Sequence, residues 1–203
     1  MSVTSIIIAT ILLTLGVAYI LTFNRFVALR NEVKNAFAQI DVQLKRRYDL
    51  IPNLVEVARG AMQHERETLE AVIQARAQAH TAAQHARNHP ADASAMAALA
   101  SAEGLLGAGL GRLMAVAESY PELQALAEMQ RLSEAINSTE NRIGFARQAY
   151  NDTVLAYNNA TDAFPSNIVA RLHRFAHLPM LEVITAPEER QPPKVQFQTG
   201  KTS

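Results

Sequence analysis

The chain opens with a long apolar segment. Residues 1–24 contain no charged side chain, and the apolar run from Val3 to Phe23 would span roughly 30 Å as a helix, the thickness of a hydrocarbon core. A cleavable signal peptide would show a basic start, a shorter apolar run and a small-x-small site, and this segment shows none of them. We therefore predict a retained transmembrane helix over residues 1–24.

Beyond the span, apolar residues recur at steps of three and four, which places them on one face of a helix. No glycine or turn cluster separates this pattern from the apolar run. We therefore predict that the membrane helix continues directly into the first helix of the remaining chain. The positions of this stripe are Phe26, Val33, Phe37, Ile40, Leu44, Tyr48, Ile51, Val55 and Ala58.

The segment QLKRRYDLIPNL, residues 43–54, places a proline inside this stripe. Because the stripe resumes beyond Pro52, we predict a bent helix rather than two helices. Proline lacks a backbone N–H, so the carbonyl of Tyr48, four residues earlier, needs water or a side-chain donor. Of the three consecutive cations at 45–47, only Arg47 lies near the apolar edge; its two neighbours turn outward.

Two further helices are expected between residues 64 and 119. The alanine-rich segment 64–89 ends at a turn over residues 88–94, where Asp92 or Ser94 can cap the next helix. The segment 95–119 contains four glycines, which weaken a helix and which we interpret as allowing close approach of a neighbouring helix. The inner side of the first of these helices is predicted to carry Leu69, Val72, Ile73 and Arg76.

A fourth long helix is predicted to begin with Ser119 as its cap and Pro121 in its first turn, and to end near Phe164-Pro165. A short amphipathic helix over residues 166–177 should follow, and the proline-rich remainder should be extended or disordered. The stripe of the fourth helix comprises Met129, Leu132, Ile136, Thr139, Ile143, Ala146, Tyr150, Val154 and Tyr157.

These elements predict an all-α protein, in which an N-terminal transmembrane helix leads into a long antiparallel helical bundle of about four helices. The predicted divisions are the anchor at 1–24, the bundle at 25–178 and the tail at 179–203.

Polar residues beside the two long stripes suggest contacts between helices. On the fourth helix, Glu140, Arg147, Asn151 and Asn158 project along one shoulder of the stripe, and Gly144 leaves a notch among them.

On the first soluble helix, Arg30 and Asp41 flank one edge of the stripe and Arg47 flanks the other. We hypothesise a partly buried polar ladder, with Arg147 paired to Asp41 or Glu140 paired to Arg47, that fixes helix register. Half-exposed flanking residues without such contacts are the alternative interpretation.

Composition and local motifs argue against catalysis. The formal net charge is zero, so no nucleic-acid partner is indicated, and the chain has no cysteine. His173 and His177 are spaced for one helical face but lack a further ligand, so we interpret them as surface residues. The run GLLGAGLG, residues 104–111, lacks the lysine and the preceding strand of a phosphate-binding loop. We expect no enzyme activity, no metal and no cofactor.

The charges beside the anchor indicate orientation. Arg25, Arg30 and Lys34 follow the apolar run, and no cationic side chain precedes it. Cationic flanks remain on the cytoplasmic side, so most of the chain is expected there. The same cations could also attract anionic lipid, although we favour the simpler topological interpretation.

Several long motifs resemble the LemA family of bacterial membrane-anchored helical proteins. They cover residues 29–60, the His64-Glu65 pair, AESYPEL at 117–123, and TENRIGFARQAYNDTVLAYNNATDAFPSNIVA at 139–170. The resemblance implies a membrane helix, a long-helix bundle without established enzymatic activity, and a role in membrane organisation. The candidate structural or interaction residues are Arg30, Asp41, Arg47, Tyr48, Pro52, Asn53, Glu140, Asn141, Arg142, Gly144, Arg147, Tyr150, Asn151, Tyr157, Phe164 and Pro165.

Together these observations predict a scaffold or interaction protein of the bacterial inner membrane that forms a homo-oligomer. The expected partners are the lipid bilayer, further copies of the chain and an unidentified membrane or cytoplasmic protein. The alternative is a sensory or regulatory module that relays a signal through the first long helix.

Overall fold

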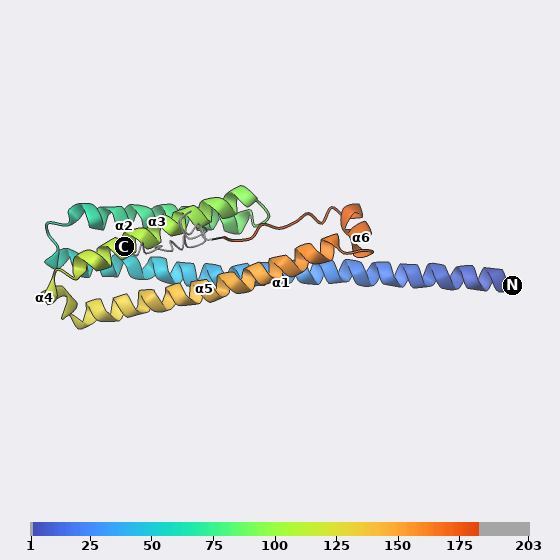
Figure 1. The fold of residues 1–203 in the computed structure, drawn as a ribbon, viewed down its shortest axis with the longest axis horizontal. Coiled ribbons are helices and arrows are strands. Elements are labelled where there is room, and N and C mark those ends of the chain that lie inside the picture. The colour runs from blue at the N-terminus through green and yellow to red at the C-terminus, as the bar shows by residue number, and fades with distance from the viewer. Residues whose placement is uncertain (1, 183–203) are drawn as a thin grey trace, which may run out of the picture.

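The computed structural model describes residues 2–182, and within this range every regular element is a helix. The predicted all-α fold is therefore confirmed. The elements are α1 (Val3–Ala61), α2 (Arg66–Asn88), α3 (Ala93–Ala117), α4 (Pro121–Gln124), α5 (Ala127–Asp162) and α6 (Ser166–Leu172) (Figure 1).

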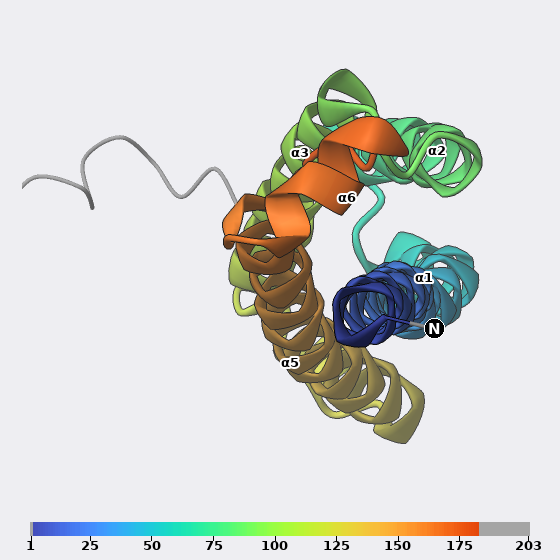
Figure 2. The ribbon, with the colours of Figure 1, turned by 90° about the vertical axis from the view of Figure 1, so that its right-hand side faces the viewer.

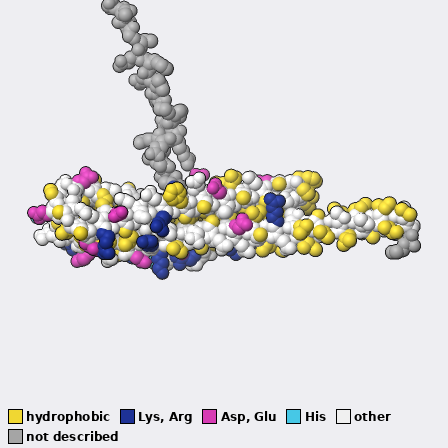
Figure 3. Space-filling view, turned by 90° about the horizontal axis from the view of Figure 1, so that it is seen from below, with side chains coloured by type: hydrophobic (Ala, Val, Ile, Leu, Met, Phe, Trp, Pro, Cys, Tyr) yellow, Lys and Arg dark blue, Asp and Glu magenta, His cyan; other side chains and the backbone are white. Residues whose placement is uncertain are grey.

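Helix α1 is a single helix of 59 residues, so it is roughly 90 Å long. As predicted, it runs without interruption from the apolar segment into the bundle, and its N-terminal part protrudes from the other helices (Figure 1). Charged side chains are visible on the bundle and absent from the protruding part in Figure 3. Both α1 and α3 are long and apolar enough to cross a membrane, but α3 packs into the bundle core, whereas the apolar window of α1 is unburied.

The bundle is built from two antiparallel pairs. α5 packs along α1, α3 packs along α2, and α1 also contacts α2 (Figures 1 and 2). The two predicted stripes form the contact between α1 and α5. Every stripe residue of α1 is buried, and on α5 only Ala146 is merely half-buried.

The prediction that a single fourth helix starts with Ser119 as its cap was wrong. Tyr120, not Ser119, precedes α4, which makes a single turn with Leu123 completely buried. The backbone then becomes extended at Leu126, with φ −70° and ψ 119°, and α5 begins only at Ala127. Leu126, at this break between α4 and α5, is 47% exposed.

The predicted helix over residues 166–177 was too long. α6 ends at Leu172, and Arg174 has a positive φ of 55°, which redirects the chain. His173 and His177 therefore do not share a helical face. His173 contacts Tyr19, whereas the His177 Nε2 lies 2.9 Å from the Asp162 carboxylate.

Two expectations for α2 and α3 also need correction. Ile73 is 40% exposed, so it does not belong to the inner side of α2. Among the glycines of α3, only Gly109 approaches a neighbouring helix: an added Cβ would lie 3.6 Å from the Val72 side chain. The expected cap is present, because the Asp92 carboxylate accepts a 2.8 Å hydrogen bond from the Ser94 N–H.

The predicted tail lies mostly outside the described residues. Its first part, residues 179–182, is extended and lies against the bundle, with Leu181 buried in the core.

Candidate functional site

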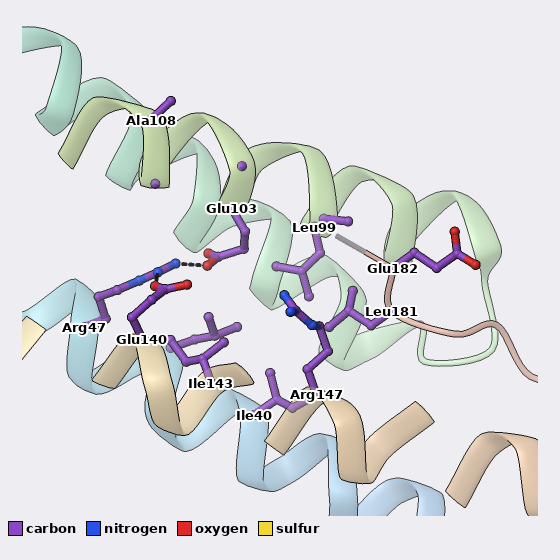
Figure 4. Close-up of a pocket in the computed structure, with 14 residues that line it drawn as sticks. Ile40, Arg47, Leu99, Glu103, Ala108, Glu140, Ile143, Arg147, Leu181 and Glu182 are labelled. Carbon is purple, nitrogen blue, oxygen red and sulfur yellow. Dashed lines mark hydrogen bonds and ion pairs between the residues drawn. The ribbon is translucent and has the colours of Figure 1, made fainter. Parts of the chain in front are cut away.

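The fourth side of the bundle is open. α3 and α5 make almost no contact with one another, although each packs closely on another helix. Between them lies a cavity of about 390 Å³, closed at one end by residues 181–182 (Figure 4). We call this side of the molecule the seam. Its apolar lining includes Ile40, Leu44, Leu99, Ala100, Ile143 and Leu181.

A charged cluster crosses the seam at one end of the cavity. Arg47 of α1 is only 1% exposed, and its guanidinium donates to the carboxylates of Glu103 on α3 and Glu140 on α5 (Figure 4). The Tyr48 hydroxyl donates to the other oxygen of Glu103. The Glu140–Arg47 contact was one of the two pairings proposed from the sequence.

Glu103 was not anticipated, although the sequence holds a signal for it. It is the only acidic residue in α3, whose only other charged residue is Arg112 near its end. A lone carboxylate on such a helix is costly to bury unless a cation meets it. Its partner could not be named, because sequence periodicity gives the face of a helix but not the helix that it meets.

The cluster fixes the arrangement of three helices more than it stabilises them. A buried ion pair offsets much of its attraction by desolvation, and here the Nε of Arg47 finds no hydrogen-bond acceptor within residues 2–182. Burial raises the pKa of the Tyr48 phenol well above its usual value, with Arg47 opposing the shift. Tyr48 therefore remains a neutral donor to Glu103.

The second proposed pairing was wrong. Asp41 contacts Arg87 of α2 at 2.5 Å, because the α2–α3 hairpin lies on that edge of α1. Arg147 instead projects from α5 into the cavity, between Leu99 and Leu181 (Figure 4). It forms no ion pair or hydrogen bond with another of the described residues 2–182.

Pro52 lies inside α1, and the carbonyl that it leaves without a backbone donor is satisfied as the sequence required. Arg76 of α2 donates from its Nε to the Tyr48 carbonyl oxygen at 2.6 Å. This bond ties α2 to α1 one turn before the proline. Asn53, next to the proline, is exposed.

The shoulder asparagines of α5 hold the extended segment that follows α6. Asn158 accepts from the Leu178 N–H at 2.9 Å and donates to its carbonyl, and Asn151 does the same for Leu181. Asn151 and Asn158 are seven helical residues apart, and Leu178 and Leu181 are three extended residues apart. Both separations are about 10 Å, so each asparagine lies opposite its leucine. The sequence placed these asparagines on one shoulder but not their partner.

Two tyrosines of the α5 stripe lie deep in the core. The Tyr150 hydroxyl donates to the Pro179 carbonyl at 2.9 Å, and burial raises the pKa of Tyr150 to about 12. Burial also raises the pKa of Tyr157, with Arg30 opposing the shift.

The remaining candidate residues lie apart from the cavity. Gly144 is half-buried, and an added Cβ would meet nothing within 4 Å. Exposed positions are Arg30, Asn141, Arg142, Phe164 and Pro165. Within residues 2–182, no group of three His, Asp or Glu side chains is placed to hold a metal ion.

Comparison with known proteins places this fold in context. The chain is 27% identical to the magnetosome protein MamQ of Magnetospirillum gryphiswaldense, over 78% of this chain and 65% of that protein. It is also 36% identical to the magnetosome proteins MamQ 1 and MamQ 2 of Paramagnetospirillum magneticum, over 38% of this chain and 29% of each of them. The chain thus spans less than two thirds of the length of these relatives.

The long unburied apolar helix and these relationships identify a membrane-associated helical protein. The sequence profile of the LemA family matches residues 36–197, which begins in the second half of α1 and takes in the rest of the bundle. The chain therefore belongs to the LemA family.

Proposed function

We propose that the protein is a non-catalytic scaffold, anchored in the bacterial inner membrane by α1, that self-associates through the seam between α3 and α5. Its role would be the organisation of the membrane or envelope. The observation that carries this proposal is the seam itself, a face of long helices that the chain leaves unfilled within residues 2–182.

The seam has room for another helix. Gly104, Gly107 and Gly111 lie on the same side of α3, and a Cβ at any of them would meet nothing within 4 Å. A second hollow of about 450 Å³ adjoins the first, and both are lined by Gly107 and Glu140. Glycines whose space is unused inside the bundle allow the backbone of an incoming helix to approach closely.

A second copy of the chain is the occupant that fits best. Glu103 and Glu140 are already engaged with Arg47, and the apolar lining and the glycines of α3 favour a helix rich in small residues, although Arg147 also projects into the cavity. α3 is such a helix, and an isologous dimer would place it against its own counterpart. Anchoring in one membrane also raises the effective concentration of copies for each other.

The same engagement supports the non-catalytic part of the proposal. A general acid or base needs a titratable group free to exchange a proton with a substrate. In the cavity, Glu103 is held by Arg47 and Tyr48, and Glu140 is held by Arg47.

Cysteine crosslinking in membranes tests self-association, because the chain has no cysteine of its own. Ala108→Cys places one thiol in the cavity wall, and Gln78→Cys places one on the exposed surface of α2 as a matched control. We expect a short bis-maleimide to give a crosslinked dimer from the Ala108 variant only. Adding Gly107→Leu should abolish the dimer, because the leucine fills the notch. Equal crosslinking from both cysteines, or a dimer indifferent to the leucine, would contradict the proposal.

The cytoplasmic orientation rests on Arg25, Arg30 and Lys34, which follow the apolar run. A membrane-impermeant maleimide should leave Gln78→Cys unlabelled in intact cells and label it after lysis. Labelling in intact cells would show that the bundle lies on the opposite side of the membrane, and this result would not contradict the scaffold proposal.

The continuity of α1 favours a second function, a module that relays a signal between the membrane and the bundle. The two functions differ in what drives assembly. A scaffold crosslinks when it is the only protein in the vesicle, whereas a relay crosslinks only once a partner has been added.

A further inference from the structure

α6 lies across the end of the bundle from which the anchor emerges. Figure 2 looks along α1 from its N-terminus, and α6 runs across the line of sight at this end. Its inner residues Val169 and Ala170 are buried in a small cluster with Phe26 of α1 and Ala160 of α5. This cluster holds α6 across the end of the bundle, beside the anchor.

The chain after α6 touches the anchor itself. The His173 ring forms a hydrogen bond with the Tyr19 hydroxyl and packs edge-on against Phe23, with ring centroids 4.8 Å apart. Phe175 packs against Phe26 at a centroid distance of 5.0 Å. Tyr19 and Phe23 belong to the last turn of the apolar run, so these contacts place α6 beside the boundary of the hydrocarbon core.

The outer side of α6 is apolar. Phe164, just before the helix, is 81% exposed, and Ile168 and Leu172 are 60% and 69% exposed. Their spacing of four residues places the two helical members on one face, opposite the buried pair. Nothing in residues 2–182 covers this face.

Three exposed cations belong to α6 or to the segments next to it and to the apolar run. Arg171 belongs to α6, Arg174 follows it, and Arg25 lies on α1 just beyond the apolar run. The acid nearest along the chain, Asp162, is already paired with His177. An apolar face rimmed by arginines at the level of the headgroups is the pattern of a helix that lies in the membrane interface.

We propose that α6, together with Phe164, is a second membrane contact of this protein. Phe164, Ile168 and Leu172 insert into the interfacial region of the leaflet on the bundle side, and Arg171 and Arg174 lie among its anionic headgroups. The proposal rests on the membrane anchoring of α1 and is independent of self-association through the seam.

The test uses the full chain in lipid vesicles with one introduced cysteine, labelled with a polarity-sensitive fluorophore. Ile168→Cys reports on α6. Phe145→Cys is the matched control, because Phe145 is 74% exposed on α5 far from the anchor, and Leu13→Cys reports on the span. We expect the fluorophores at 168 and 13 to emit at shorter wavelength and to be quenched by brominated lipids, with 168 quenched best by bromines near the headgroups. The fluorophore at 145 should be neither shifted nor quenched.

The outcomes separate cleanly. The proposal is overturned if the fluorophore at 13 is quenched while the one at 168 is as exposed to water as the one at 145. Leu172→Cys repeats the measurement at a second site on the same face. A fluorophore at 13 that is not quenched overturns the anchoring of α1, and with it the proposed function. Arg171→Glu with Arg174→Glu should reduce quenching at 168 in anionic vesicles; an unchanged signal overturns the role of the arginines.

Discussion

The two acids of the buried charge cluster are expected to contribute unequally to the free energy of unfolding. Glu103 is 17% exposed and accepts hydrogen bonds from both Arg47 and Tyr48, whereas Glu140 is 57% exposed and, among residues 2–182, accepts only from Arg47. Removing one partner of a buried ion pair typically costs about 3–5 kcal/mol, whereas an exposed pair contributes at most about 1 kcal/mol. Because Glu140 still balances Arg47 after the loss of Glu103, we expect Glu103→Ala to cost about 3 kcal/mol and Glu140→Ala about 1 kcal/mol.

The measurement is reversible denaturant unfolding of the full chain in detergent, followed by the helical circular dichroism signal. Glu56→Ala is a suitable control, because Glu56 pairs with Arg59 at 3.3 Å on the exposed surface, and it should leave the midpoint unchanged. Equal losses for the two cluster acids would refute the argument, since it derives their difference from burial and from the Tyr48 hydroxyl.

A double-mutant cycle sharpens the same prediction. Arg47→Met alone leaves two carboxylates facing each other across the seam, and Glu103→Leu alone removes one of two counter-charges. Replacing both residues together removes an ion pair whose desolvation had offset much of its attraction. The double variant should therefore be more stable than the sum of the single losses implies, by about 2 kcal/mol. Additive losses would show that Arg47 and Glu103 do not act as a pair.

Three further predictions concern other contacts of the bundle. Arg76→Met should lower the free energy of unfolding by about 1–2 kcal/mol, because the carbonyl released by Pro52 loses its donor; the loss should shrink in a Pro52→Ala background, which restores a backbone N–H. Asn158→Ala should speed amide hydrogen exchange at Leu178 while leaving the helix intact by circular dichroism, and unchanged exchange would refute the clamp. Burial raises the pKa of Tyr150 from 10 to about 12, so the unfolded chain loses this proton first and stability should fall as pH rises from 10 to 12; Tyr150→Phe should flatten the fall in denaturant titrations across that range.

The parts of the fold that the sequence predicted are those governed by local periodicity. The stripes of α1 and α5 are buried as expected, since a repeat of three and four determines which side of a helix is apolar. The donor for the Tyr48 carbonyl could be required in advance, because proline always removes the same backbone bond. Local rules also limited the cap of α3 to Asp92 or Ser94, and Asp92 takes this role.

The parts that the sequence missed depend on which helices meet. Asp41 turned out to face the α2–α3 hairpin, so it pairs with Arg87 rather than with Arg147. Glu103 contacts Arg47 of α1, and the Leu178 backbone contacts Asn158 of α5. Both contacts depend on the tertiary arrangement of the helices. The α3 glycines were expected to admit a neighbour within the bundle, but most of them face the open seam. Which side of α3 meets another helix depends on the order of helices around the bundle, and the helical pattern does not contain that order.

The anchor and α6 together constrain how two copies could meet. In the proposed dimer both copies would carry their bundles on the same side of one membrane, so a two-fold axis relating them would run along the membrane normal. The seam lies between α3 and α5, and a membrane contact by α6 would limit the tilt of the bundle and keep the seam facing a neighbour. Two α3 helices brought together in this way run parallel, with Gly107 opposite its own counterpart. Same-residue crosslinks along α3 should therefore be strongest at positions 104, 108 and 111 and weak at 105 and 109, which point elsewhere on the helix. Strong crosslinks between opposite ends of α3 would instead require an antiparallel pair, which no two copies anchored in one membrane with their bundles on the same side can form.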